Sequence, residues 1–113
     1  MTKTEKKIDK NIREALTLAC DEILELVPGF EWLTHQVDFK SVASTLKVSC
    51  IFATQIAQTN ALYAQYDKQM SQLIQSKLAN IGIHLKDIRQ ICFDNEEQCL
   101  AEHGGNWALR LAC

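Results

Sequence analysis

The sequence has few residues that break regular structure, with one proline and four glycines among 113 residues. Their scarcity predicts long helices and strands joined by few loops. No apolar run approaches the roughly 20 residues that span a membrane, and the first residues lead into no apolar segment of a signal peptide. We therefore expect a cytoplasmic protein that does not engage a membrane.

An excess of charge of either sign is also lacking, since 12 Lys and Arg stand against 14 Asp and Glu, for a formal net charge of −2. Binding to nucleic acid depends largely on neutralised phosphates, so a dedicated binder usually carries a basic excess. Nucleic acid is therefore a less favoured partner than protein. The hydrophobic fraction of 47% and the charged fraction of 23% are ordinary for a globular protein, and the length fits a single domain over residues 1–113.

The cysteines form no recognisable framework. Their number is odd and no Cys-x-x-Cys pair occurs, which indicates neither a closed set of disulfides nor a zinc ribbon. Three of them lie among apolar neighbours and are interpreted as small core residues in a reducing compartment. The five are Cys20, Cys50, Cys92, Cys99 and Cys113, of which the first three are the core candidates.

Two long helices are predicted from apolar residues at three- and four-residue intervals. The first spans about 5–27, with Thr2 and Glu5 at the spacing of a capping box and Pro28 after its end. The second is clearest over 61–81, where Gly82 fits a left-handed cap. Its expected apolar stripe is Tyr63, Tyr66, Met70, Leu73, Ile74, Leu78 and Ile81.

Alternating apolar and polar residues predict two strands, at 30–39 and 46–53, joined as an antiparallel hairpin. The inward positions would be Leu33, Val37, Phe39, Leu46, Val48, Cys50 and Phe52, with His35 in phase. A third strand is expected at about 87–93. Asp94, with Glu97 three residues later, would then cap a short helix that ends at Gly104, and 106–113 would be a further helical turn or two, or an extended tail.

The resulting order, α-β-β-α-β-α, predicts an α+β fold. A helical crossover between the second and third strands makes them parallel, so the three-stranded sheet is mixed. We expect a two-layer sandwich in which both long helices cover one face of the sheet and the other face meets solvent.

Two polar clusters have the residue types of metal or acid–base sites. Cys99 and His103 are four residues apart on the last predicted helix, but zinc requires further ligands that the sequence does not place nearby. Four carboxylates gather near the start of that helix, where capping and the helix dipole already favour them. They are Asp94, Glu96, Glu97 and Glu102. Both clusters are interpreted as structural, and no metal or cofactor is expected.

No nucleophile is clearly paired with a base. Cys50 and His35 would lie on neighbouring strands, but a buried thiol in apolar surroundings is inert. The sequence also contains no GxGxxG, GxxxxGK, HExxH or GxSxG pattern. We therefore expect no enzyme, and a small metal-dependent or cysteine enzyme is the third-ranked function.

The outward face of the predicted hairpin is the candidate binding surface. Trp32 would lie there beside Thr34 and Gln36, opposite Lys47 or Ser49 on the next strand. An exposed indole among polar groups can anchor a partner, which favours an interaction module that binds a protein or itself. In the alternative interpretation, Trp32 is covered by the C-terminal tail or a β-bulge shifts its phase.

A basic N-terminal helix supports the second-ranked function, nucleic-acid binding or transcriptional regulation. The residues concerned are Lys3, Lys6, Lys7, Lys10 and Arg13. A solvated helix end explains the same residues more simply, given the acidic total.

Four segments resemble a family of small uncharacterised proteobacterial proteins, some of which are labelled Fis family transcriptional regulators. The segments are 30–35, 46–48, 93–97 and 104–107, and residues 105–112 are similar to the start of the Fis helix-turn-helix. In Fis, a turn and a basic recognition helix follow, which this sequence does not contain, so no DNA-contacting residue is carried over. The element order is also similar to KH-like and BolA-like domains, although the Gly-x-x-Gly loop of KH domains is absent.

Overall fold

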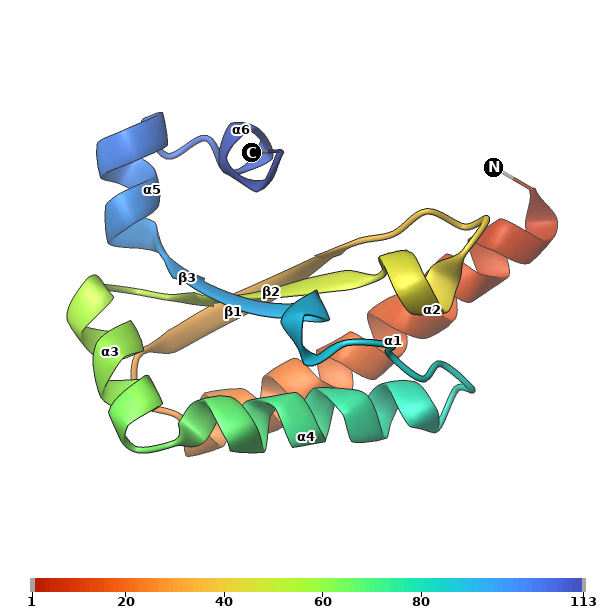
Figure 1. Ribbon diagram of the computed structural model, residues 1–113, viewed down its shortest axis with the longest axis horizontal. Helices are drawn as coiled ribbons and strands as arrows, with labels where there is room; N and C mark the ends of the chain where they lie inside the picture. The colour runs from red at the N-terminus through yellow and green to blue at the C-terminus, as the bar shows by residue number, and fades with distance from the viewer. Residues whose placement is uncertain (1, 113) are drawn as a thin grey trace.

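A computed structural model describes residues 2–112, and a three-stranded mixed sheet lies at its centre (Figure 1). The strands are β1 (Phe30–Gln36), β2 (Lys47–Phe52) and β3 (Ile91–Asn95), in the spatial order β1-β2-β3. β1 and β2 are antiparallel, whereas β2 and β3 are parallel. The predicted α+β fold with a mixed sheet is confirmed.

Two long helices, α1 (Lys3–Leu26) and α4 (Tyr66–Ala79), cover one face of the sheet (Figure 1). The predicted capping box begins α1, since the Glu5 N–H donates to Thr2 Oγ1 at 3.1 Å and the Thr2 N–H donates to Glu5 Oε1 at 3.3 Å. The core lies between these helices and the sheet, and its fully buried residues include Ile12, Ala19, Ile23, Val48, Cys50, Phe52, Ile74 and Leu78. Two long helices over one face are therefore confirmed.

A β-bulge near the start of β1 sends two aromatic side chains to opposite faces. Phe30 pairs with Phe52 and is buried in the core, while Trp32 pairs with Ile51 on the other side, with the register shift between Phe30 and Trp32. Without the extra residue, Glu31, the side chains of Phe30 and Trp32 would share a face. The bulge lies before Trp32, so the predicted phase of the following residues is retained. β1 ends at Gln36, and Val37 and Phe39 lie outside it, before the single turn α2 (Val42–Thr45), so the predicted strand is too long.

The crossover from β2 to β3 contains two helices where one was predicted. α3 (Gln55–Tyr63) starts early because Thr54 Oγ1 accepts the Ala57 N–H at 3.1 Å, and Gln65, with φ of 63°, separates it from α4. This turn leaves Tyr63 85% exposed, so its predicted place in the apolar stripe is wrong. Gly82 has a φ of 81°, and the Ile83 N–H donates to the Leu78 carbonyl at 2.9 Å, as a left-handed cap requires.

The C-terminal part differs most from the prediction. A 3-10 turn, η1 (Ile88–Gln90), precedes β3, and α5 (Glu96–His103) is capped by Asn95, whose Oδ1 accepts the Gln98 N–H at 2.7 Å. Asp94 is therefore a strand residue, and the predicted capping box with Glu97 is wrong because β3 continues to Asn95. The tail forms α6 (Trp107–Leu111), the helical alternative, while Cys113 lies outside the described residues. α5 and α6 lie on the side of the sheet opposite α1 and α4 (Figure 1).

Candidate functional site

The sheet has a second face, on the side away from α1 and α4, and the five candidate residues lie along it. Thr34 pairs with Ser49, Gln36 pairs with Lys47, and Trp32 pairs with the buried Ile51. The alternation of β1 and β2 thus brings together the residues that the sequence pattern had assigned to one surface. Only part of this face is open, because α5 and α6 lie over it at the Trp32 end (Figure 1).

Trp32 is half-buried and packs against Trp107 of α6. The two rings meet edge to face, with centroids 5.2 Å apart and an interplanar angle of 87°. A single carboxylate joins them, since Trp32 Nε1 donates to Glu96 Oε1 at 2.6 Å and Trp107 Nε1 donates to Glu96 Oε2 at 3.0 Å. Of the two interpretations of Trp32, the structure shows the one in which the C-terminal tail covers the indole.

Arg110 fixes the other side of α6. Its Nε and Nη2 donate to the two carboxylate oxygens of Asp94 at 2.6 and 2.8 Å, and its Nη1 donates to Glu102 Oε2 at 2.6 Å. Burial raises the pKa of Asp94, but the hydrogen bonds from Arg110 and from the Asn95 N–H outweigh it, so the net pKa is lowered. With its side chain 12% exposed, Arg110 is a largely buried cation paired with Asp94 in bidentate geometry. We call Trp32, Asp94, Glu96 and Glu102 the α6 seat.

The acidic cluster therefore serves the fold. Asp94 and Glu102 bind Arg110, Glu96 binds both indoles, and Glu97 Oε1 accepts the Gln55 N–H at 3.1 Å. Within residues 2–112, no group of three or more His, Cys, Asp or Glu side chains is arranged to bind a metal ion. Cys99 is fully buried, and burial raises the pKa of its thiol, whereas Nδ1 of His103 lies 3.3 Å from Arg110 Nη1.

Beyond the seat, four polar residues of the second face are not used by the fold. No side-chain hydrogen bond or ion pair joins Thr34, Gln36, Lys47 or Ser49 to any other residue in the part of the chain that the structure describes. Ser49 is the central member and is 3% exposed, so its neighbours enclose it almost completely. We call these four residues the polar strip. Hydroxyl, amide and ammonium groups in one row can bind hydrogen-bonding or anionic groups.

The Cys50–His35 pair has no catalytic geometry. Cys50 is fully buried, and burial raises the pKa of its thiol to about 12, so the thiol stays protonated at neutral pH. His35 instead places Nε2 3.4 Å from Asp9 Oδ1 of α1, and its strand partner is Val48. A protonated thiol that solvent does not reach is a poor nucleophile.

Side chains occupy part of both edges of the sheet. At the β1 edge, burial raises the pKa of the Cys20 thiol, and a hydrogen bond from the Leu33 backbone N–H to its sulfur partly offsets that effect. At the β3 edge, Gln58 Nε2 donates to the Phe93 carbonyl at 3.2 Å. Such contacts reduce the number of free backbone groups that a further strand can pair with. The face of the sheet is therefore a better candidate surface than its edges.

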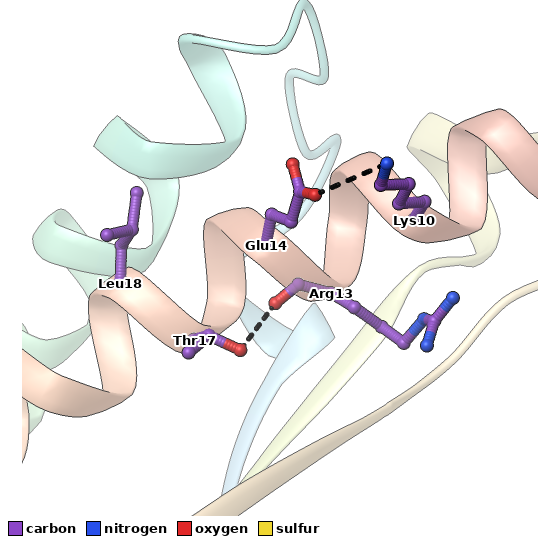
Figure 2. Close-up of a pocket in the computed structure, with 5 residues that line it drawn as sticks. All are labelled: Lys10, Arg13, Glu14, Thr17 and Leu18. Atoms are coloured by element: carbon purple, nitrogen blue, oxygen red, sulfur yellow. Dashed lines mark hydrogen bonds and ion pairs between the residues drawn. The ribbon is translucent and has the colours of Figure 1, made fainter.

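The basic N-terminal residues lie along α1, where two of the five have acidic partners. Arg13 Nε lies 3.0 Å from Asp9 Oδ2, and Lys10 Nζ lies 3.9 Å from Glu14 Oε1. Lys10 and Glu14 line an open groove of about 560 Å³ along α1, and Figure 2 shows this ion pair among the residues that line it. Local pairing of this kind reduces the positive potential available to a phosphate backbone.

The sequence pattern names Glu96 only as a member of the acidic cluster and does not identify Trp107 or Arg110 as its neighbours at this end of the molecule. Helix-dipole and capping arguments explain a carboxylate at Glu96 but do not identify its partners, which come from β1 and α6. A signal for Arg110 was present, since one basic residue follows four carboxylates within 16 positions. Which of these carboxylates pair with Arg110 was not predictable, because the turn at Gly104 determines where α6 lies.

The fold and this site define a small α+β chain with a polar sheet face and a C-terminal helix seated beside it. No family model, no curated protein and no solved structure matches this chain significantly. Among the helices of residues 2–112, none combines the length and the apolar character needed to cross a membrane.

Proposed function

We propose that this chain is a non-catalytic cytoplasmic interaction module that binds a protein partner, or a second copy of itself, through the second face of its sheet. The polar strip is the observation that carries this proposal. Four polar side chains stand in register on two paired strands and have no hydrogen-bond or ion-pair partner within the described residues, whereas each member of the neighbouring seat bonds to α5 or α6. Thr34, Gln36 and Lys47 reach solvent and are available for recognition, whereas Ser49 is buried beneath the surface of the strip.

The shape of the surface supports the same proposal. Trp32 and Trp107 form a rigid aromatic boundary at one end of the strip, because Glu96 fixes both rings. Strand residues hold the strip itself, so binding requires little ordering of the backbone. Lys47 is its one charged member, which favours a partner that presents an acidic or hydrogen-bonding segment.

The chemistry of the other polar groups favours binding over catalysis. The carboxylates near the strip are neutralised by Arg110 or bound to N–H groups, and the Cys50 thiol has a pKa of about 12. A general acid or base needs access to substrate and a pKa near the working pH. The Cys50 thiol lacks both properties, since it is fully buried and its pKa is about 12, and the pKa of Asp94 is lowered, away from neutral pH.

The test compares partner capture by three purified proteins. The wild-type chain and a Gln36→Glu/Lys47→Glu variant are immobilised and exposed to the same cell extract, and captured proteins are quantified by mass spectrometry. The control variant is Lys68→Glu/Gln75→Glu, which makes the same charge change on exposed residues of α4, across the sheet. Self-association of each protein is measured in parallel by sedimentation.

The proposal requires that the strip variant lose a specific partner, or its self-association, by at least about tenfold while the control retains it. Both variants should keep the unfolding temperature of the wild type, because no hydrogen bond or ion pair within residues 2–112 involves the substituted side chains. Equal binding by the strip variant and the wild type would exclude the second face as the binding surface.

A further inference from the structure

We infer that α6 is an exchangeable segment, which a second copy of this chain inserts into the α6 seat in place of the seat's own helix. The inference rests on the proposed function, because it names the second copy as a partner of the same sheet face. The product is a two-fold dimer in which each chain donates one α6 and accepts one.

The first support is the way in which α6 is held. Its side-chain bonds to the seat come from two residues, Trp107 to Glu96 and Arg110 to Asp94 and Glu102. The seat contributes three carboxylates, and Arg110 is the cation bound between two of them. A five-residue helix is too short to be stable alone in water, so the seat determines its conformation. The seat is thus a receptor for an aromatic residue followed three positions later by arginine.

The second support is the connection between α5 and α6. Only Gly104, Gly105 and Asn106 separate the two helices, and both glycines are left-handed, with φ of 60° and 84°. The turn is closed by the Gly104 N–H to the Leu100 carbonyl and the Gly105 N–H to the Cys99 carbonyl, each at 3.1 Å. A change of φ at these two residues converts the turn into an extended hinge and moves α6 away from its own chain.

Exchange conserves every contact of α6, because the acceptor seat is chemically identical. The balance between monomer and dimer therefore depends on the turn and on protein concentration. A connection this short holds α6 near its own seat at an effective concentration of about 1 mM, which keeps the wild-type chain mainly monomeric in dilute solution. Any change that disfavours the closed turn without altering the seat should shift the population toward the dimer.

Gly104→Val is such a change. A β-branched residue strongly disfavours a φ of +60°, whereas a Cβ at this position meets no atom within 4 Å beyond the adjacent residues, so the substitution acts mainly through the backbone. Each dimer that forms opens two closed turns and so relieves the strain of two valines. The dissociation constant of the dimer should therefore fall on the order of a hundredfold relative to the wild type. Gly104→Asn is the matched control, because asparagine adopts the left-handed conformation and preserves the turn.

Mass is measured by sedimentation velocity from about 10 µM to about 1 mM, and tryptophan emission is recorded on the same samples. We expect dimers of Gly104→Val with the emission of the wild type, since the Trp32–Trp107 contact re-forms between chains. The Gly104→Asn control should remain monomeric over most of this range. Adding Arg110→Ala or Trp107→Ala to Gly104→Val should abolish the dimer, and circular dichroism of both double variants establishes that the core remains folded.

Two results would overturn the inference. One is a monomeric Gly104→Val chain with red-shifted emission, which means that α6 detaches without entering another seat. The other is a dimer that survives both Arg110→Ala and Trp107→Ala, which means association through a different surface. Neither result bears on binding through the polar strip, because the Gln36→Glu/Lys47→Glu variant tests that binding separately. Failure of exchange and failure of the proposed function are therefore distinguishable.

Discussion

The indole rings of Trp32 and Trp107 meet edge to face, and both donate to the same carboxylate, that of Glu96. One ring belongs to an edge strand of the sheet and the other to the last helix. Because each Glu96 oxygen accepts one indole N–H, the carboxylate links β1, α5 and α6 through two charge-assisted hydrogen bonds. This link determines how much of the second face remains open.

Glu96→Gln should destabilise the protein although it preserves the shape of the side chain. An amide has one acceptor oxygen, so one of the two indole N–H groups would face an NH2 group and lose its partner. We expect the free energy of unfolding to fall by about 1–2 kcal/mol, measured by urea denaturation. Glu31→Gln, at the exposed bulge residue, is the control and should change it by less than about 0.5 kcal/mol. Equal effects of the two substitutions would contradict the role of Glu96 as a bridge.

The sheet was predictable because its signal is local. Alternation in 46–53 placed Val48, Cys50 and Phe52 in the core, and the same period on β1 placed Thr34 and Gln36 on the second face. The bulge at Glu31 did not disturb this result, since it precedes Trp32. Side-chain alternation follows from backbone geometry and needs no knowledge of distant residues.

The covering of Trp32 was not predictable in the same way, because it depends on residues far apart in sequence. Helix propensity and capping signals indicate that the tail can be helical, but not where it docks. The turn at Gly104 and Gly105 directs Trp107 and Arg110 to a seat formed by β1, β3 and α5. Likewise, the competition between Asp94 and Asn95 for the cap of α5 is decided by the extent of β3, which pairing with β2 determines.

Acid should release α6 before the core unfolds. The pKa of Asp94 in the folded chain lies below its ordinary value of 3.8, so the stabilisation by the Arg110 pair is fully present above that pH and is lost as the pH falls through the folded pKa. We expect a red shift of tryptophan emission below a pH of about 4, at a pH where the helical circular dichroism is retained.

Arg110→Met is the control for this transition, because it removes the cation while retaining an apolar side chain. The variant should show the red-shifted emission already at neutral pH and no further step in acid. If wild-type emission changes only together with loss of helix, then α6 and the core form one cooperative unit, and separate release of α6 is excluded.

Cys50 should react with an alkylating reagent far more slowly than the half-buried Cys20 and Cys92. It is fully buried with a thiol pKa of about 12, whereas Cys20 and Cys92 are half-buried. Iodoacetamide treatment followed by peptide mass spectrometry should show modification of Cys50 at least about a hundredfold slower than that of Cys92, unless the chain is first unfolded. Preferential alkylation of native Cys50 would instead indicate an activated thiol and favour the cysteine-enzyme alternative.

The basic end of α1 should bind nucleic acid weakly, because Asp9 and Glu14 already pair with Arg13 and Lys10. Fluorescence anisotropy with a labelled duplex at about 50 mM salt, where phosphate contacts are strong, should show no saturable binding at micromolar protein. Glu14→Gln removes one competing carboxylate and should raise the apparent affinity only if phosphates bind this patch. Saturable binding that Glu14→Gln strengthens and a Lys6→Glu/Lys7→Glu variant abolishes would make nucleic-acid recognition, and not protein binding, the preferred function.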